Sequence, residues 1–176
     1  MNYVEREKSV PAEIRGDSAW NAKAYRLALF LAELSWHDST KLLGDKRTIS
    51  LADQLNRAAG AVSADIEEGY SRGTGKDRAR FYEYGLGSAR EARGWYYKGR
   101  HILGEAVSTH RMQLLTQIIR LLLTMAPDQR GSVLREAPVP YGASFESRVT
   151  PLDIASEPLL TNIQIGRAHR LNSSHT

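Results

Sequence analysis

The stretch Leu51–Glu91, LADQLNRAAGAVSADIEEGYSRGTGKDRARFYEYGLGSARE, decides the fold expected for this chain. Its first half repeats apolar residues at steps of three and four, the spacing of one face of an α-helix: Leu51, Leu55, Ala58, Ala59, Val62 and Ile66. Its second half opens at Thr74, with Asp77 three residues on, in a weaker form of the capping box. Because glycines and cations separate the halves, the stretch predicts a helical hairpin with a basic turn.

The flanking sequence adds one helix on each side of this hairpin. A first helix is expected over residues 17–43, with Asp17 or Ser18 as its N-cap. A fourth is expected over residues 108–126, and Pro127 is expected to close it. No segment alternates apolar and polar residues as a half-buried strand would. The sequence therefore predicts an all-α protein, an antiparallel up-down-up-down four-helix bundle.

The predicted bundle has an extension at each end. Residues 1–16 are expected to form an N-terminal extension, residues 17–126 the bundle, and residues 127–176 an extended or disordered tail, since five of the six prolines lie there. Residues 165–176, IGRAHRLNSSHT, resemble a translated sequencing-adapter oligonucleotide with one change of reading frame. Both an assembly artefact and a genuine chain end stay open for this segment.

Composition excludes several classes of protein. The chain has no cysteine, which rules out disulfide frameworks and thiolate metal sites. The N-terminus has no apolar run of signal-peptide length, and the most apolar segment, Leu114–Met125, is short and carries Arg120. A cytoplasmic protein that is not exported is the expectation.

The net charge of +4 is concentrated in one part of the chain. Residues 1–69 hold 9 Lys and Arg against 11 Asp and Glu, whereas residues 70–111 hold 9 against 4. Such a basic segment attracts phosphate backbones by counterion release. Solvated charge on a long helix is the plainer interpretation.

The turn Arg72–Lys76 resembles a phosphate-binding loop but misses its spacing. The earlier glycine, Gly69, is one place too far from Gly75, and Asp77 stands where Ser or Thr would bind magnesium. Nucleotide hydrolysis is therefore not favoured. Amides at the start of the third helix, flanked by cations, remain a candidate phosphate site, with an ordinary basic turn as the alternative.

Metal and acid-base chemistry find little support. Glu33 with His37, and His101 with Glu105, are spaced for single helical contacts and not for a dinuclear site, so no metal and no cofactor are expected. An acidic cluster before Gly69 is interpreted as structural, with an interhelical basic partner. The cluster is Asp65, Glu67 and Glu68, and its candidate partners are Arg57, Arg90 and Arg93.

Aromatic and basic residues interleave along the third helix, a pattern that can stack and clamp unpaired bases. Phe81 and Trp95 are expected in the core or at a subunit interface, and Tyr82, Tyr96 and Tyr97 are the candidates for exposed contacts. The same helix contains four glycines, each costing about 1 kcal/mol relative to alanine: Gly85, Gly87, Gly94 and Gly99. Close helix packing is the expected reason, with a local kink as the alternative.

The ordered motifs of the hairpin resemble those of a known bacterial family. They are Gln54-x-x-Arg57-Ala58, Asp65-Ile-Glu-Glu-Gly69, Arg80-Phe81 and Gly87-Ser88-Ala-Arg-Glu91. Over about residues 18–126 the chain is similar to the four-helix bundle proteins related to the 23S rRNA intervening-sequence protein and to the accessory variability determinant of diversity-generating retroelements. The resemblance implies an antiparallel four-helix bundle that assembles as a homopentamer, and the retroelement relatives bind RNA and a reverse transcriptase.

Two hypotheses about function follow. The first is a non-enzymatic, oligomeric bundle that binds RNA or an RNA–protein complex through a basic surface. That surface comprises Arg72, Lys76, Arg78, Arg80, Arg90, Arg93 and Arg100. The second is a protein-interaction scaffold whose third helix grips a reverse transcriptase, and an enzyme is the least favoured class.

Overall fold

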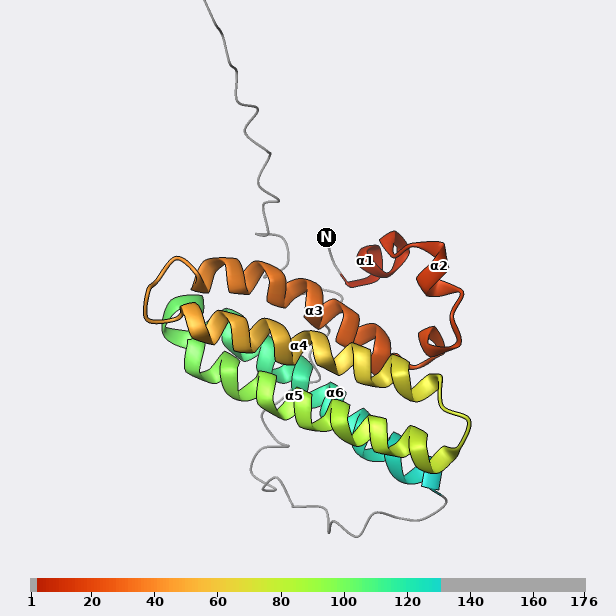
Figure 1. Cartoon of the computed structure of the whole chain (residues 1–176). Helices are drawn as coiled ribbons and strands as arrows, with labels where there is room; N and C mark the ends of the chain where they lie inside the picture. Colours follow the sequence, from red (N-terminus) through yellow and green to blue (C-terminus); the bar gives the residue numbers. More distant parts are fainter. Residues whose placement is uncertain (1–2, 131–176) are drawn as a thin grey trace, which may run out of the picture.

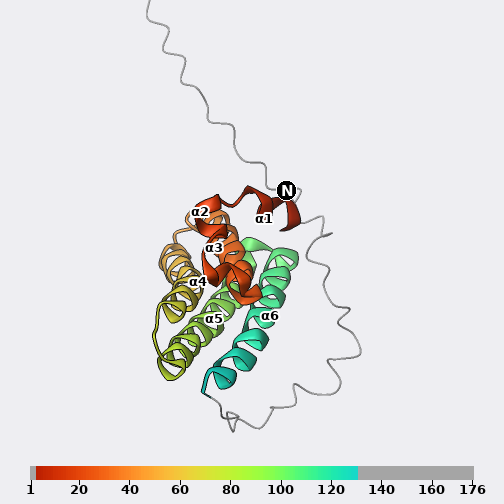
Figure 2. The ribbon, with the colours of Figure 1, turned by 90° about the vertical axis from the view of Figure 1, so that its right-hand side faces the viewer.

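The computed structural model describes residues 3–130 of the chain. Four long helices run back and forth through them (Figure 1): α3 Lys23–Leu42, α4 Ile49–Tyr70, α5 Gly75–Leu103 and α6 Glu105–Arg130. Each packs most closely on the next in sequence, while α3 and α6 meet less extensively (Figure 2). The predicted all-α four-helix bundle is confirmed. The tail predicted to be disordered beyond Arg130 and the adapter-like segment 165–176 lie outside the described residues.

The core forms where the apolar stripe of each helix turns inward. On α4, Leu55, Val62 and Ile66 are fully buried, as their helical spacing predicts. They meet side chains such as Leu31 of α3 and Ile118 of α6, which are equally buried in the same cluster. Removing a side chain of this size from water contributes about 1.5–3 kcal/mol to stability, so the stripe, more than helix propensity, holds the bundle together.

The first predicted helix is divided in two. Asp17 caps a short 3₁₀ helix, η1 Ser18–Asn21, by accepting a hydrogen bond from the Ala19 amide at 2.7 Å. The backbone is then extended at Ala22, and α3 begins only at Lys23. The capping signal at Asp17 was correctly placed, but it opens η1 and not the long helix.

The predicted N-terminal extension is folded onto the bundle over its described part. It contains α1 Tyr3–Ser9, which packs on α3, and the short α2 Ala12–Arg15, none of whose residues is buried (Figure 1). The Tyr3 ring stands edge-on to Phe30 at 5.3 Å between centroids, and Arg6 Nε lies 2.6 Å from the Glu33 carboxylate. An aromatic contact and an ion pair therefore attach α1 to α3.

The third helix begins and ends where the sequence predicts. The Thr74 hydroxyl accepts from the Asp77 amide at 3.1 Å and donates to the Asp77 carboxylate at 2.7 Å, closing the predicted capping box. At its other end Gly104 has φ 91°, a conformation that glycine adopts without strain, and the chain turns there directly into α6. The α6 helix accordingly starts at Glu105, three residues earlier than predicted.

The prediction that Pro127 closes the last helix is wrong, because α6 continues through it to Arg130. Proline costs the helix one backbone hydrogen bond, but tertiary contacts hold the final turn against α5. Arg130 lies 2.8 Å from Glu83, and the Gln129 side chain accepts from Arg78 at 3.3 Å.

The four glycines of α5 divide into two pairs. A Cβ built on Gly85 would lie 3.4 Å from Asp65 of α4, and one on Gly99 would lie 3.4 Å from Leu42 and Leu51 side chains. Close packing, as predicted, explains this pair. No packing within the described chain explains Gly87 and Gly94, since a Cβ there would meet nothing within 4 Å among residues 3–130.

Candidate nucleic-acid interface

The hairpin turn forms one end of the bundle, and its capping box positions the candidate residues. The α4 helix ends at Tyr70, and the α5 helix begins at Gly75 after Thr74. This short connection places Arg72 beside the first two turns of α5. Cations from a loop and a helix thereby meet on one surface.

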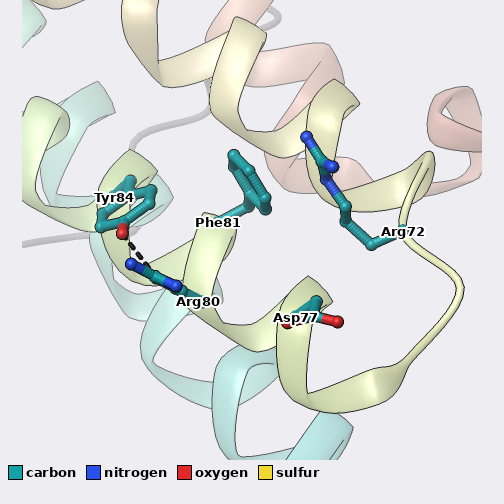
Figure 3. A pocket seen from close by; sticks show the side chains of 5 residues that line it. All are labelled: Arg72, Asp77, Arg80, Phe81 and Tyr84. Atoms are coloured by element: carbon teal, nitrogen blue, oxygen red, sulfur yellow. Dashed lines mark hydrogen bonds between the residues drawn. The ribbon is translucent and has the colours of Figure 1, made fainter.

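A hollow of about 460 Å³ opens on this surface, lined by Arg72, Asp77, Arg80, Phe81 and Tyr84. In Figure 3 the Arg72 guanidinium and the Phe81 ring face each other, with the guanidinium carbon 4.3 Å from the ring centroid. Arg80 Nε donates to the Tyr84 hydroxyl at 2.6 Å. The rings of Phe81 and Tyr84 meet edge to face at 5.6 Å and 88°. The hollow thus combines two aromatic rings, two guanidinium groups and one carboxylate.

Among residues 3–130, the Arg72 side chain contacts the Phe81 ring and one carboxylate, and its Nε is buried without a hydrogen-bond partner. Its guanidinium forms an ion pair with Glu68, one helical turn earlier, and both side chains are partly open to solvent. Ion pairs of this kind contribute about 0–1 kcal/mol, because water screens them. Arg72 can therefore leave the Phe81 ring at little cost when a stronger anion is offered.

A second hollow lies between the start of α5 and the end of α6 and is lined by Gly75, Lys76, Gln129 and Arg130. Lys76 is exposed there and has no ion-pair partner among residues 3–130. Its ammonium group is therefore open to an incoming phosphate.

Arg78 turns inward and is a structural residue. It donates to the Gly69 carbonyl at 3.3 Å and to the Gln129 side chain at 3.3 Å, and it lies over the Tyr70 ring at 5.6 Å. These contacts tie the end of α4, the start of α5 and the last turn of α6 together.

The other three predicted cations do not join the turn. Arg93 points toward α6, where it donates to Thr116 at 3.2 Å. Arg100 lies over the Tyr97 ring at 4.1 Å and 3.5 Å from Glu105. Twenty residues separate it from Arg80, or about 30 Å along the helix. Arg90 is exposed midway between them. The seven residues therefore divide into Arg72, Lys76 and Arg80 at the turn, the inward-turned Arg78, and three distant members, and do not form one continuous patch.

Burial changes the list of candidate aromatic contacts. Tyr82 and Tyr96 are buried, so their predicted exposure is wrong, whereas Tyr97 is 54% exposed. Phe81 and Trp95 are both half-buried, and Trp95 packs against the core. Sequence reasoning missed Tyr84, which is 45% exposed in the hollow, although its spacing of four from Arg80 predicts a shared helix face.

The acidic cluster takes up structural contacts near the hollow. Asp65 accepts a hydrogen bond from Ser88 of α5 at 3.1 Å, and burial raises the pKa of its carboxyl. Glu68 pairs with Arg72. The proposed partner Arg57 is wrong, because its guanidinium lies 3.1 Å from Glu91 and not on the cluster.

A second polar cluster, which the sequence did not reveal, is buried at the opposite end of the bundle. Arg111 of α6 pairs with Asp38 of α3, Nε to Oδ2 at 2.8 Å, and the Tyr96 hydroxyl donates to the same oxygen at 3.0 Å. The His110 ring lies beside Arg111 at 2.9 Å, and burial followed by that guanidinium lowers the pKa of His110 to about 4. This cluster joins three helices and is almost entirely buried.

Two further observations bear on the class of protein. Between residues 3 and 130 no group of three or more His, Asp or Glu side chains is arranged to hold a metal ion. In the same range, no helix is long and apolar enough to cross a membrane.

Comparison with known proteins gives one match. The family model described as 23S rRNA-intervening sequence protein matches residues 21–124, which is more than half of the chain. No curated protein and no solved structure matches. The matched range covers almost all of α3 to α6 and excludes α1, α2 and most of η1.

Proposed function

The chain belongs to the 23S rRNA-intervening sequence protein family, and we propose that it binds RNA, or an RNA–protein complex, without catalysing a reaction. The observation that carries the proposal is the convergence of Arg72, Lys76 and Arg80 at the α4–α5 turn. Cations that neutralise phosphates release condensed counterions, and this term supplies most of the sequence-independent affinity for nucleic acid.

The groups at the turn favour an RNA ligand over an acidic protein surface. The three cations line two hollows at the start of α5, where the Asp77 amide is bonded to the Thr74 hydroxyl. The helix dipole also favours an anion at this end of α5. Two aromatic rings beside the cations offer stacking surface for unpaired bases.

Replacing the three cations by glutamine tests the proposal. The variant Arg72→Gln, Lys76→Gln, Arg80→Gln should lose most of its affinity for a structured RNA in fluorescence anisotropy. The slope of log affinity against log salt should decrease in magnitude by about 2, as three lost single-strand phosphate contacts predict.

A control variant with the same net charge distinguishes a site at the turn from an effect of total charge. Lys8→Gln, Lys46→Gln, Lys98→Gln removes the same charge from exposed positions away from the turn. It should bind RNA within about twofold of the unmodified chain, since distant surface charges are screened over about 10 Å. Equal losses in both variants would refute a site at the turn.

We also propose that the chain assembles with copies of itself, as a pentamer. The number five comes from the family resemblance, and support for assembly comes from Gly87 and Gly94 of α5, where an added Cβ would meet nothing within 4 Å among residues 3–130. Each costs the helix about 1 kcal/mol relative to alanine, and close approach of a second chain is a reason to retain them.

Mass measurement in solution tests this assembly. The unmodified chain should have five times the monomer mass, and Gly87→Leu, Gly94→Leu should reduce it by placing bulk between the subunits. A monomeric unmodified chain would refute the assembly. An unchanged mass with a more stable double variant would show that these glycines face solvent.

A scaffold for a reverse transcriptase is the second candidate, and the same open glycines favour it. A partner helix could approach the outer side of α5 there as closely as a second copy could. A reverse-transcriptase gene and template repeat beside this gene, with co-purification of the two proteins that Gly87→Leu abolishes, would support the scaffold. A gene within a 23S rRNA insert would favour the RNA-binding function.

A further inference from the structure

We propose that the hollow at the α4–α5 turn binds one unpaired guanine of the RNA, with Phe81 stacking on the base and Asp77 reading its Watson–Crick edge. This inference rests on the proposed RNA binding and adds a base preference to it. It concerns Arg72, Asp77, Arg80, Phe81 and Tyr84, which line the hollow.

The carboxylate is the feature that phosphate binding does not explain. Asp77 lies between two arginines in a hollow that should otherwise attract only anions (Figure 3). Its capping role uses Oδ2, which accepts from the Thr74 hydroxyl. Among residues 3–130, Oδ1 has no hydrogen-bond partner, and the residue is exposed. A ligand suited to this site therefore presents hydrogen-bond donors as well as negative charge.

Guanine meets that requirement better than the other bases. Its N1–H and N2–H donors lie side by side, matching the two oxygens of a carboxylate in a bidentate pair. Adenine and cytosine each offer a single amino donor beside an acceptor nitrogen, and uracil offers one N–H between two carbonyls. An aspartate at the base edge therefore favours guanine, and the other three bases place acceptors against it.

The Phe81 ring supplies the stacking surface. It is covered by the Arg72 guanidinium at 4.3 Å, a planar cation at about the separation that a stacked base would take. Within residues 3–130 the other partner of the Arg72 side chain is Glu68, in an exposed ion pair, so a phosphate can draw the guanidinium off the ring. The base then takes the place of the guanidinium on Phe81, and Arg72 neutralises the phosphate of the same nucleotide.

Tyr84 and Arg80 form the far wall of the hollow. The 2.6 Å hydrogen bond from Arg80 to the Tyr84 hydroxyl fixes the guanidinium, and Tyr84 packs edge-on against Phe81. The ring that stacks and the cation that meets the next phosphate are thus positioned before RNA arrives. Preorganisation of this kind lowers the ordering cost of binding.

Short uridine oligonucleotides with one central guanine, adenine or cytosine test the inference by fluorescence anisotropy. The unmodified chain should bind the guanine oligonucleotide about tenfold more tightly than the others, the discrimination expected of one bidentate base contact. Asp77→Asn should abolish the preference without weakening the all-uridine oligonucleotide, because it removes a negative charge and keeps the oxygen that accepts from Thr74.

Two further variants distinguish the base contact of Asp77 from base stacking on Phe81 and from a general effect of charge. Phe81→Leu, which keeps an apolar side chain in the hollow, should weaken the binding of every oligonucleotide about tenfold through loss of base stacking. Asp53→Asn, an equal change of charge at an exposed position on α4, should leave affinity and preference unaltered. Circular dichroism and melting temperature verify that Asp77→Asn and Phe81→Leu remain folded.

The outcomes distinguish this inference from the function on which it rests. Salt-dependent binding of all oligonucleotides with equal affinity would overturn the guanine site and leave RNA binding intact. A guanine preference that persists in Asp77→Asn would overturn the role of Asp77. Absence of binding to any oligonucleotide or structured RNA would overturn both proposals.

Discussion

The two ends of the bundle carry polar clusters of opposite kinds. At the turn, Arg72 and Arg80 lie on aromatic rings beside water, and their ion pair and hydrogen bond are exposed. At the other end, Arg111 and Asp38 are enclosed among α3, α5 and α6 with Tyr96 bonded to them. Guanidinium groups occur in both places, so their surroundings decide what they do.

Solvent access explains the difference. A buried charge loses its hydration and depends on its partner, so breaking the pair is costly and the cluster serves the fold. An exposed guanidinium keeps most of its hydration and exchanges partners cheaply, so it can serve a ligand. The comparison predicts that substitutions in the buried cluster lower stability alone. Substitutions of the cations at the turn should weaken RNA binding and change stability little.

The largest effect is expected from Asp38→Ala. It leaves Arg111 buried without its carboxylate, and the free energy of unfolding in urea should decrease by about 3–5 kcal/mol. Asp53→Ala, at an exposed position, is the control and should change it by less than about 0.5 kcal/mol. Similar changes in the free energy of unfolding for the two variants would show that the buried ion pair contributes no more to stability than an exposed residue does.

His110 makes the stability of the buried end depend on pH. Its pKa is lowered from 6.5 to about 4 in the folded chain, so the unfolded chain binds more protons between these values. Stability therefore decreases as pH falls through this window. Between about pH 7.5 and about pH 5 the loss from this group is about 2 kcal/mol.

Urea unfolding at the two pH values measures this contribution. In His110→Asn the free energy of unfolding should lose about 2 kcal/mol less between these pH values than in the unmodified chain. His37→Asn, at an exposed site of α3, should show the same pH dependence as the unmodified chain. An identical pH profile for His110→Asn and the unmodified chain would contradict the role of burial.

An intermediate effect is expected from Gly75→Ala at the turn. A Cβ on Gly75 would lie 2.3 Å from the Gln129 carbonyl oxygen, so the last turn of α6 must shift. Crowding of this kind costs about 1–3 kcal/mol. Gly73→Ala, where a Cβ meets nothing within 4 Å, should be nearly neutral in the same thermal melts. Equal melting temperatures would show that α6 does not pack on this turn.

The smallest effect on stability is expected from the triple variant at 72, 76 and 80. Its exposed contacts contribute little, so the free energy of unfolding should change by less than about 0.5 kcal/mol per residue even though RNA binding is lost. A large loss of stability would show that these cations stabilise the fold, as the buried Arg111–Asp38 pair does, and would contradict the difference between the two ends.

Local patterns predicted most of the helices, and tertiary contacts explain the errors. The Thr74 cap and the Gly104 terminus were found from sequence because each depends on neighbours within a few residues. Pro127 was wrongly expected to end α6, since the contacts that hold the last turn come from Arg78 and Glu83, about fifty residues away. Gly87 resembles Gly85 in sequence, and only the packing of α4 separates them.

The charge distribution of the sequence predicted where the candidate site lies along the chain but not which of its side chains are exposed. Charge counts located the cations in residues 70–111, and helical spacing alone could have paired Arg80 with Tyr84. Which tyrosines are exposed could not be deduced, because Tyr82, Tyr84 and Tyr96 differ only in the side of α5 that meets the other helices.

The sequence by itself determined the helices, their order and the basic character of the hairpin, because periodicity, caps and charge are properties of neighbouring residues. Only the tertiary structure decided that Arg72, Lys76 and Arg80 converge while Arg93 and Arg100 do not, and that Arg111 is buried on Asp38. Exposure and pairing depend on how helices pack side by side. That packing brings together residues that lie far apart along the chain.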